Sequence, residues 1–166
     1  MRGQPNLALA RRRAKAVLAT LDIPVPWSLT AFLSSIERQR GRRILLVPST
    51  MSRYAAVASG LWISRGEEDL IVYDATASPL HRQNTVFHEL AHMLLGHRGR
   101  PLSGGTQGNQ PPLMMHRQHY EDQLELEAET LAYEMWRAVG QRLLTRHGTA
   151  GRLAGAFEAP PGVRHA

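Results

Sequence analysis

The chain has 166 residues and a formal net charge of +6 at pH 7, and it contains no cysteine. This length fits one domain, and the lack of cysteine excludes disulfide scaffolds, iron–sulfur clusters and zinc fingers with thiolate ligands. No apolar run approaches the roughly 18 residues of a membrane-spanning helix, and the early apolar run Leu7–Ala10 leads directly into three arginines, which is unlike a signal peptide. We therefore expect a cytoplasmic protein that does not bind a membrane.

The positive charge is concentrated in the first third of the chain, and Lys15 is the only lysine among the 20 basic residues. A basic region can contact nucleic acid or an acidic partner, but a solvated arginine surface is the simpler interpretation. The two helices expected in this region are joined by a proline-rich link, unlike the short glycine turn of a helix-turn-helix. We therefore expect no direct binding of nucleic acid.

Two helices are predicted at the N-terminus, over residues 7–21 and 29–40. Asn6 and Ser28 precede them as capping residues, and apolar residues recur within each segment at helical spacing. Pro24 falls between the two segments and separates them.

Three strands are predicted next, over Arg43–Val47, Gly60–Ile63 and Leu70–Tyr73. Each is a short run rich in isoleucine, leucine, valine or aromatic residues. The second and third flank a polar, glycine-containing turn at residues 65–69, which indicates a hairpin. We therefore expect a short and mostly antiparallel sheet.

A third helix is predicted over residues 79–95, because Ser78-Pro79 combines a capping residue with a proline in the first helical position. Residues 98–118 are rich in glycine and proline, so we expect a mobile loop that borders the active cleft. Helical spacing returns over Tyr120–Arg137. The glycine-, alanine- and proline-rich end of the chain, residues 148–166, is expected to be a flexible tail.

These elements predict an α+β fold in one domain. The domain is expected to span residues 1–147, with N-terminal helices in residues 6–40, a sheet in residues 43–73 and active-site helices in residues 79–137. The sheet is expected to pack on the helices.

The stretch His88-Glu89-Leu90-Ala91-His92 lies inside the third predicted helix. Helix positions i and i+4 share one face, so the two imidazoles can bind one tetrahedral ion, most commonly zinc. Glu89 lies beside the pair, where it can take a proton from an attacking water without ligating the metal. The pattern predicts a zinc site with Glu89 as general base.

Glu125 is the best candidate for a third ligand. Glu121, Glu125 and Glu129 are spaced at i, i+4 and i+8 on one helical face, where like charges repel unless a cation is present. Glu129, one turn after Glu125, suits a carboxylate that hydrogen-bonds a ligand histidine. Glu127 is expected to point to a different face.

A hydrolytic site also needs a donor for the oxyanion. Four residues near the metal-binding motifs are candidates: His97, His116, His119 and Tyr120. His97 follows Gly96, which is expected to end the helix, and ligation of the metal by His97 is a less favoured alternative.

Several segments together resemble the ImmA/IrrE family of zinc metallopeptidases. They are Gly60–Ile63, Asp69–Tyr73, Thr85–His97 and Glu125–Ala132, and the resemblance covers roughly residues 28–137. The string HELAHMLLGH combined with the later ELEAETLA helix is more specific than either alone. The chain departs from the family in Leu131, where phenylalanine is common, and in Met135-Trp136-Arg137, which replaces a leucine–proline ending.

The resemblance implies a small zincin-like fold with a thermolysin-like (gluzincin-type) core. It implies that His88, His92 and Glu125 bind Zn²⁺ and that Glu89 is the catalytic acid and base. Members of the family commonly act beside a helix-turn-helix repressor or antitoxin and cleave it to release genes of stress response, mobile elements or toxin–antitoxin units. A protein substrate that itself binds DNA is therefore expected.

A second hypothesis treats the chain as a non-proteolytic zinc-binding module that docks and sequesters a DNA-binding partner. The intact Glu89 favours the enzyme, because a purely structural zinc ion needs no base. An exposed edge strand, either Gly60–Ile63 or Leu70–Tyr73, is expected to hold the substrate by strand addition.

Overall fold

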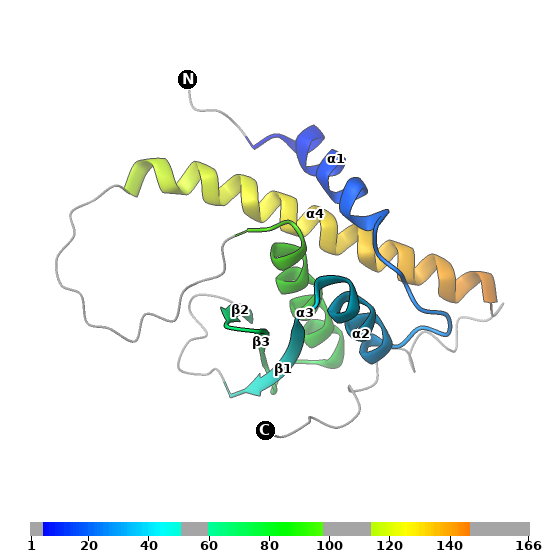
Figure 1. The fold of residues 1–166 in the computed structure, drawn as a ribbon. Coiled ribbons are helices and arrows are strands. Elements are labelled where there is room, and N and C mark those ends of the chain that lie inside the picture. Colours follow the sequence, from blue (N-terminus) through cyan, green and yellow to red (C-terminus); the bar gives the residue numbers. More distant parts are fainter. Residues whose placement is uncertain (1–4, 51–59, 98–113, 147–166) are drawn as a thin grey trace.

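The computed structural model describes residues 5–50, 60–97 and 114–146, with side chains of the last segment described over 122–141 (Figure 1). In these residues four helices and three strands follow one another as α1 (Leu7–Leu18), α2 (Leu29–Arg40), β1 (Arg43–Ser49), β2 (Gly60–Arg65), β3 (Glu68–Asp74), α3 (Pro79–Leu94) and α4 (Met114–Arg146). The predicted α+β class is confirmed. Among the described helices, none is both long and apolar enough to cross a membrane.

The N-terminal helices form where their caps predict. The side chains of Asn6 and Ser28 accept hydrogen bonds from the backbone of Leu9 and Ala31, at 2.9 and 3.0 Å. Helix α1 nevertheless ends at Leu18 and not at the predicted residue 21. The chain tightens there, because the next amides bond to carbonyls three residues earlier, as Thr20 does to Val17.

The sheet has the strand order β1-β3-β2, so the last strand in sequence is the central one. β2 and β3 form the predicted antiparallel hairpin, with Gly66 in its turn at φ 51°. β1 pairs with β3 in parallel, with Leu45 opposite Leu70. The sheet is therefore mixed, because β1 pairs with the edge of β3 that β2 leaves open and runs parallel to β3.

Helix α4 is longer than predicted. It spans Met114–Arg146, so its first residues belong to the segment predicted as a loop over 98–118. Between the prolines before residue 113 and the glycine at 148, Gly140 is the only glycine or proline, and an interior glycine costs about 1 kcal/mol. Residues 98–113 of the predicted loop and the predicted tail at residues 148–166 lie outside the described residues.

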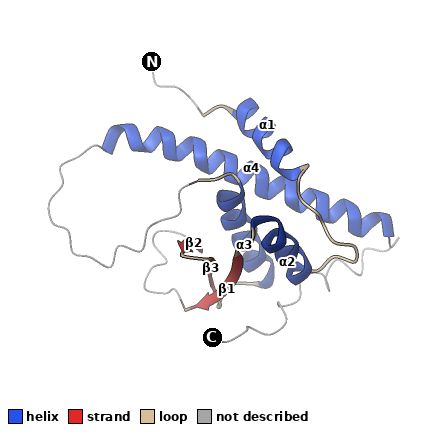
Figure 2. Ribbon diagram, in the orientation of Figure 1, coloured by secondary structure: helices blue, strands red, loops and turns tan. Residues whose placement is uncertain are grey.

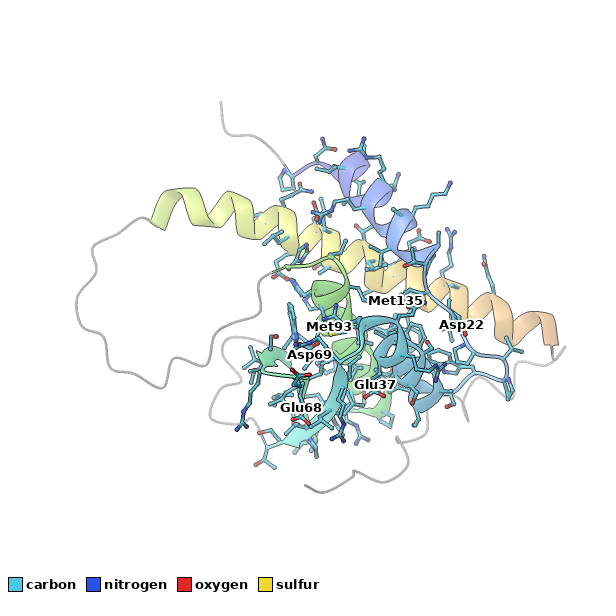
Figure 3. The ribbon with its side chains drawn as sticks, in the orientation of Figure 1. Asp22, Glu37, Glu68, Asp69, Met93 and Met135 are labelled. Atoms are coloured by element: carbon cyan, nitrogen blue, oxygen red, sulfur yellow. The ribbon has the colours of Figure 1, made fainter. Side chains whose placement is uncertain are left out.

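Helix α3 lies between the sheet and α4, and α1 packs along the opposite side of α4 (Figure 2). Phe87 and Leu90 of α3 are fully buried. Phe87 lies 6.0 Å from Phe32 of α2 and 4.8 Å from Trp136 of α4 between ring centroids. Met93 of α3 and Met135 of α4 are also buried in this core (Figure 3). Aromatic packing therefore connects α2, α3 and α4.

A buried carboxylate ties the sheet to the end of α2. Asp69 of β3 is fully buried (Figure 3) and accepts hydrogen bonds from Arg40 at 3.0 Å and from Arg42 at 3.2 Å. The indole Nε1–H of Trp62 donates to its other oxygen at 3.1 Å. Burial raises the pKa of Asp69, but the hydrogen bonds from Arg42, Trp62 and Arg40 outweigh it and leave the pKa below its ordinary value.

We expect Asp69→Asn to lower the free energy of unfolding by about 3–5 kcal/mol, because it leaves two arginines beside a neutral buried group. Urea-induced unfolding of the metal-free protein measures the change. The control is Glu68→Gln, whose exposed pair with Arg43 spans 3.3 Å and should contribute at most about 1 kcal/mol. Equal effects of the two substitutions would contradict the assignment.

The pH dependence of the free energy of unfolding should also reflect the ion pairs of Asp69. Because the folded-state pKa of Asp69 is lowered, its contribution is complete above the unfolded value of about 3.9 and is lost as the pH falls through the folded value. Asp69→Asn should therefore show a shallower loss of stability below about pH 4 than the wild type.

Candidate metal centre

Helix α3 places His88 and His92 side by side. Its start is fixed by Ser78, whose hydroxyl accepts a hydrogen bond from the amide of His81 at 3.3 Å, and by Pro79 in the first turn. One helical turn separates the two histidines, and their ring centroids lie 4.7 Å apart. Their Nε2 atoms approach to 3.1 Å, so both rings present the same nitrogen to one point.

Glu125 of α4 completes a group of three ligand atoms. Its Oε2 lies 3.2 Å from Nε2 of His88, and its Oε1 lies 3.4 Å from Nε2 of His92. Two ligands bound about 2.0–2.1 Å from a tetrahedral ion are about 3.3 Å apart. The three side chains therefore fit a tetrahedral metal ion, and the half-exposed Glu125 side chain leaves the site open to solvent.

The electrostatics of the group favour positive charge. The close approach of the His88 and His92 imidazoles holds the pKa of Glu125 far below its ordinary range. The hydrogen bond to Glu125 in turn raises the pKa of His88 against the opposing effect of burial, with further contributions from Glu89 and Glu129. A carboxylate that strongly attracts two imidazoles is also suited to attract a divalent cation.

Glu89 turns away from the ligand group and toward the sheet. Its Oε2 accepts a hydrogen bond from the backbone N–H of Trp62 in β2 at 2.9 Å. Burial raises the pKa of Glu89 despite the opposing charges of His88 and His92. A carboxylate with a raised pKa, beside the ligands but not among them, has the properties of a general base.

The close approach of β2 to α3 depends on Gly60. A Cβ atom at this position would lie 2.3 Å from Cγ2 of Thr85 and 3.1 Å from Oε1 of Glu89. Any larger residue would therefore push β2 away from the helix that carries the site. Sequence reasoning included Gly60 in a strand but did not identify this packing role.

His97 contacts His92 from behind. Gly96, at φ 71°, ends α3 in a turn in which the amides of Gly96 and His97 bond to the carbonyls of Met93 and His92. This turn brings Nδ1 of His97 to 2.9 Å from Nδ1 of His92, while its Nε2 lies 3.3 Å from Glu127. Both nitrogens of this buried ring are thus engaged, which leaves neither as an oxyanion donor. Burial lowers the pKa of His97.

Glu127 is the residue that sequence reasoning missed. It is not in the ligand group with Glu125; it is almost fully buried behind the site, where it contacts His97 and forms an ion pair with Arg13 of α1. A signal was present in the sequence. Glu127 precedes the buried Leu131 by one turn and therefore shares the apolar stripe of α4.

The other predicted residues are placed as follows. Glu129 is exposed on α4; it contributes to the raised pKa of His88, but the hydrogen-bond partner of His92 is His97. The three remaining candidates for an oxyanion donor lie on the first turns of α4, and their side chains are outside the described set: His116, His119 and Tyr120.

Comparison with known proteins gives one match. The family model of the IrrE N-terminal-like domain, Peptidase_M78, matches residues 41–136. That segment is more than half of the chain and contains His88, Glu89, His92 and Glu125, but it leaves out α1. No curated protein and no solved structure matches the chain.

We expect Gly60→Ala to destabilise the protein by about 1–3 kcal/mol, because the new methyl group overlaps Thr85. Thr85→Ser removes the Cγ2 atom in question and should restore part of the loss in the double variant. Gly140→Ala is the control: its Cβ meets nothing within 4 Å, and the substitution should stabilise the helix by up to about 1 kcal/mol. Thermal unfolding measures all four proteins, and a neutral Gly60→Ala would contradict the close packing.

Proposed function

We propose that this chain, which belongs to the Peptidase_M78 family of IrrE N-terminal-like domains, is a zinc-dependent endopeptidase that cleaves a partner protein. The observation that carries the proposal is the meeting of His88, His92 and Glu125 in one group, with Glu89 beside it but not among the ligand atoms. A purely structural zinc site has no use for a carboxylate beside the ligands that does not bind the ion.

The ligand set indicates which metal the site prefers. Two imidazole nitrogens and one carboxylate suit zinc, whereas magnesium and calcium prefer oxygen ligands alone. Three protein ligands leave the fourth tetrahedral position free, which is the arrangement of catalytic zinc sites. His88, His92 and Glu125 would hold the ion at the solvent-facing edge between α3 and α4.

A bound zinc ion supplies Lewis acidity, which polarises the scissile carbonyl and eases deprotonation of water. Glu89 takes the proton from the attacking water and passes it to the leaving amine as the peptide bond breaks. The raised pKa of Glu89, caused by its burial, suits a group that must both accept and donate a proton. The N–H of Trp62 fixes the position of its carboxylate meanwhile.

Strand β2 offers a place for the substrate backbone. It lies at the edge of the sheet, and among the described strands only β3 pairs with it. Its first residue, Gly60, is next to Glu89. A substrate segment added to this edge in an extended conformation would pass close to the catalytic carboxylate.

The substrate we propose is a helix-turn-helix transcriptional repressor or antitoxin in the cytoplasm. The support is the resemblance of the HELAHMLLGH and ELEAETLA segments to the ImmA/IrrE family. Cleavage of such a regulator would release the genes that it represses, in stress response, mobile-element control or a toxin–antitoxin unit.

Removal of a ligand should remove the metal. We expect His88→Ala and Glu125→Ala to lower the zinc content of the purified protein strongly, from about one ion per chain, because a structural gap replaces one of only three protein ligands. Glu129→Gln is the matched control on α4 and should retain zinc. Elemental analysis decides each assignment, and full occupancy in a ligand variant would overturn it.

The role of Glu89 separates an enzyme from a binding module. Glu89→Gln keeps the size and polarity of the side chain, so zinc should stay bound, while cleavage should fall by about 10²–10⁴-fold with the loss of the base. The assay co-expresses the chain with a helix-turn-helix protein, chosen from a neighbouring reading frame where the genome encodes one, and follows its cleavage. A wild-type chain that binds this partner without cutting it would instead indicate sequestration.

A further inference from the structure

A line of polar side chains runs from α1 through the core to the candidate metal centre. Arg13 of α1 pairs with Oε2 of Glu127, the same carboxylate lies 3.3 Å from Nε2 of His97, and Nδ1 of His97 lies 2.9 Å from Nδ1 of His92. These four residues come from three helices and the turn after α3. Every member of the line therefore depends on tertiary packing.

Because Glu127 and His97 are buried, their polar groups must find partners within the protein. The side chains of Glu127 and His97 are 2% and 3% exposed, and a buried carboxylate is costly unless it is paired. Arg13 supplies the opposite charge, and Gln123 donates a hydrogen bond to Oε1 of Glu127 at 2.9 Å. Arg13 also donates to the carbonyl of Leu95 at 3.0 Å, so one guanidinium holds both Glu127 and the end of α3.

The hydrogen-bonding capacities of the groups fix the direction of the line. An ionised carboxylate only accepts hydrogen bonds, so Nε2 of His97 must carry the proton toward Glu127. Nδ1 of a neutral His97 then accepts, so Nδ1 of His92 must donate. The proton of the His92 ring is thereby placed on Nδ1. Its Nε2, which lies 3.1 Å from Nε2 of His88 and 3.4 Å from Glu125, then carries the lone pair that a metal ligand needs.

We propose that Arg13, Glu127 and His97 are positioning residues that set the tautomer and orientation of His92 for metal binding. The proposal rests on the proposed function, because it takes His92 to be a zinc ligand. It adds α1 to the metal centre, although the family match covers only residues 41–136. Partners of ligand histidines of this kind commonly change metal affinity by about 10–100-fold.

The first test measures zinc affinity by competition with a chromophoric chelator. We expect Glu127→Gln to bind zinc about 10–100-fold more weakly, because Oε2 of Glu127 contacts both Arg13 and His97 and a neutral amide binds these two groups less strongly than a carboxylate does. Arg13→Ala should weaken binding in the same direction, and Arg13→Lys should recover part of it. Arg12→Ala is the matched control, since Arg12 is exposed one position earlier on α1, and it should bind zinc as the wild type does.

The second test needs no metal. Long-range ¹H–¹⁵N NMR of the zinc-free wild type should show His92 protonated at Nδ1, and Glu127→Gln should shift His92 toward the Nε2-protonated form. Circular dichroism identifies variants that remain folded, and if Glu127→Gln does not fold, the half-exposed Arg13 carries both measurements. Unchanged zinc affinity in folded variants, or an Nε2-protonated His92 in the wild type, would overturn the proposal.

The two proposals fail in different ways. A wild-type chain that binds no zinc would contradict the proposed function, whereas the tautomer of His92 would still decide the role of Glu127 and His97. A wild type that binds zinc equally well with and without Glu127 would leave the peptidase proposal standing and remove this one.

Discussion

The packing of α3 against α4 sets the geometry of the site, because each helix carries ligands that the other lacks. Phe87 and Trp136 meet at 4.8 Å between ring centroids, and the indole of Trp136 donates to Asn84 at 3.2 Å. These contacts fix the axial position and the rotation of α4 relative to α3, and so bring Glu125 close to His88. The ligand group therefore depends on the core, since close packing holds core side chains in defined rotamers.

The carboxylates of Asp69, Glu127 and Glu89 differ in the groups that compensate their charge. Asp69 accepts from two arginines and an indole, and Glu127 accepts from an arginine, an amide and a histidine. Glu89 receives one backbone hydrogen bond, and its pKa is raised. The lowered pKa of Asp69 keeps it ionised, whereas the raised pKa of Glu89 leaves it able to exchange a proton. The carboxylates with a structural role therefore accept more hydrogen bonds than the candidate catalytic carboxylate does.

Much of this arrangement could be predicted from local patterns. The bounds of α2 and α3 follow from Ser28, Ser78 and Gly96, which act on backbone groups within a few residues. The pair His88 and His92 follows from helical periodicity alone. The histidines that Glu125 meets lie on another helix, so local periodicity could not assign it. Its prediction needed the spacing of the acidic residues and the resemblance to a known family.

The features that could not be predicted depend on contacts between distant segments. The parallel pairing of β1 is decided by where the hairpin docks, and the ion pair of Arg13 with Glu127 joins α1 to α4. Its spacing from Leu131 marks Glu127 as a buried position, but only the packing of α1 and the turn at His97 decide which groups it pairs with. Local propensity does not contain this information.

The site also has a thermodynamic consequence for the whole chain. Its ligands come from two helices that are far apart in sequence, so an ion held by His92 and Glu125 would act as a cross-link between them. The unfolded chain cannot assemble these ligands, and binding free energy then becomes folding free energy. At a free metal concentration 1,000 times the dissociation constant, this linkage amounts to about 4 kcal/mol. Metal supply would thereby govern how long the folded protein persists, separately from how fast it works.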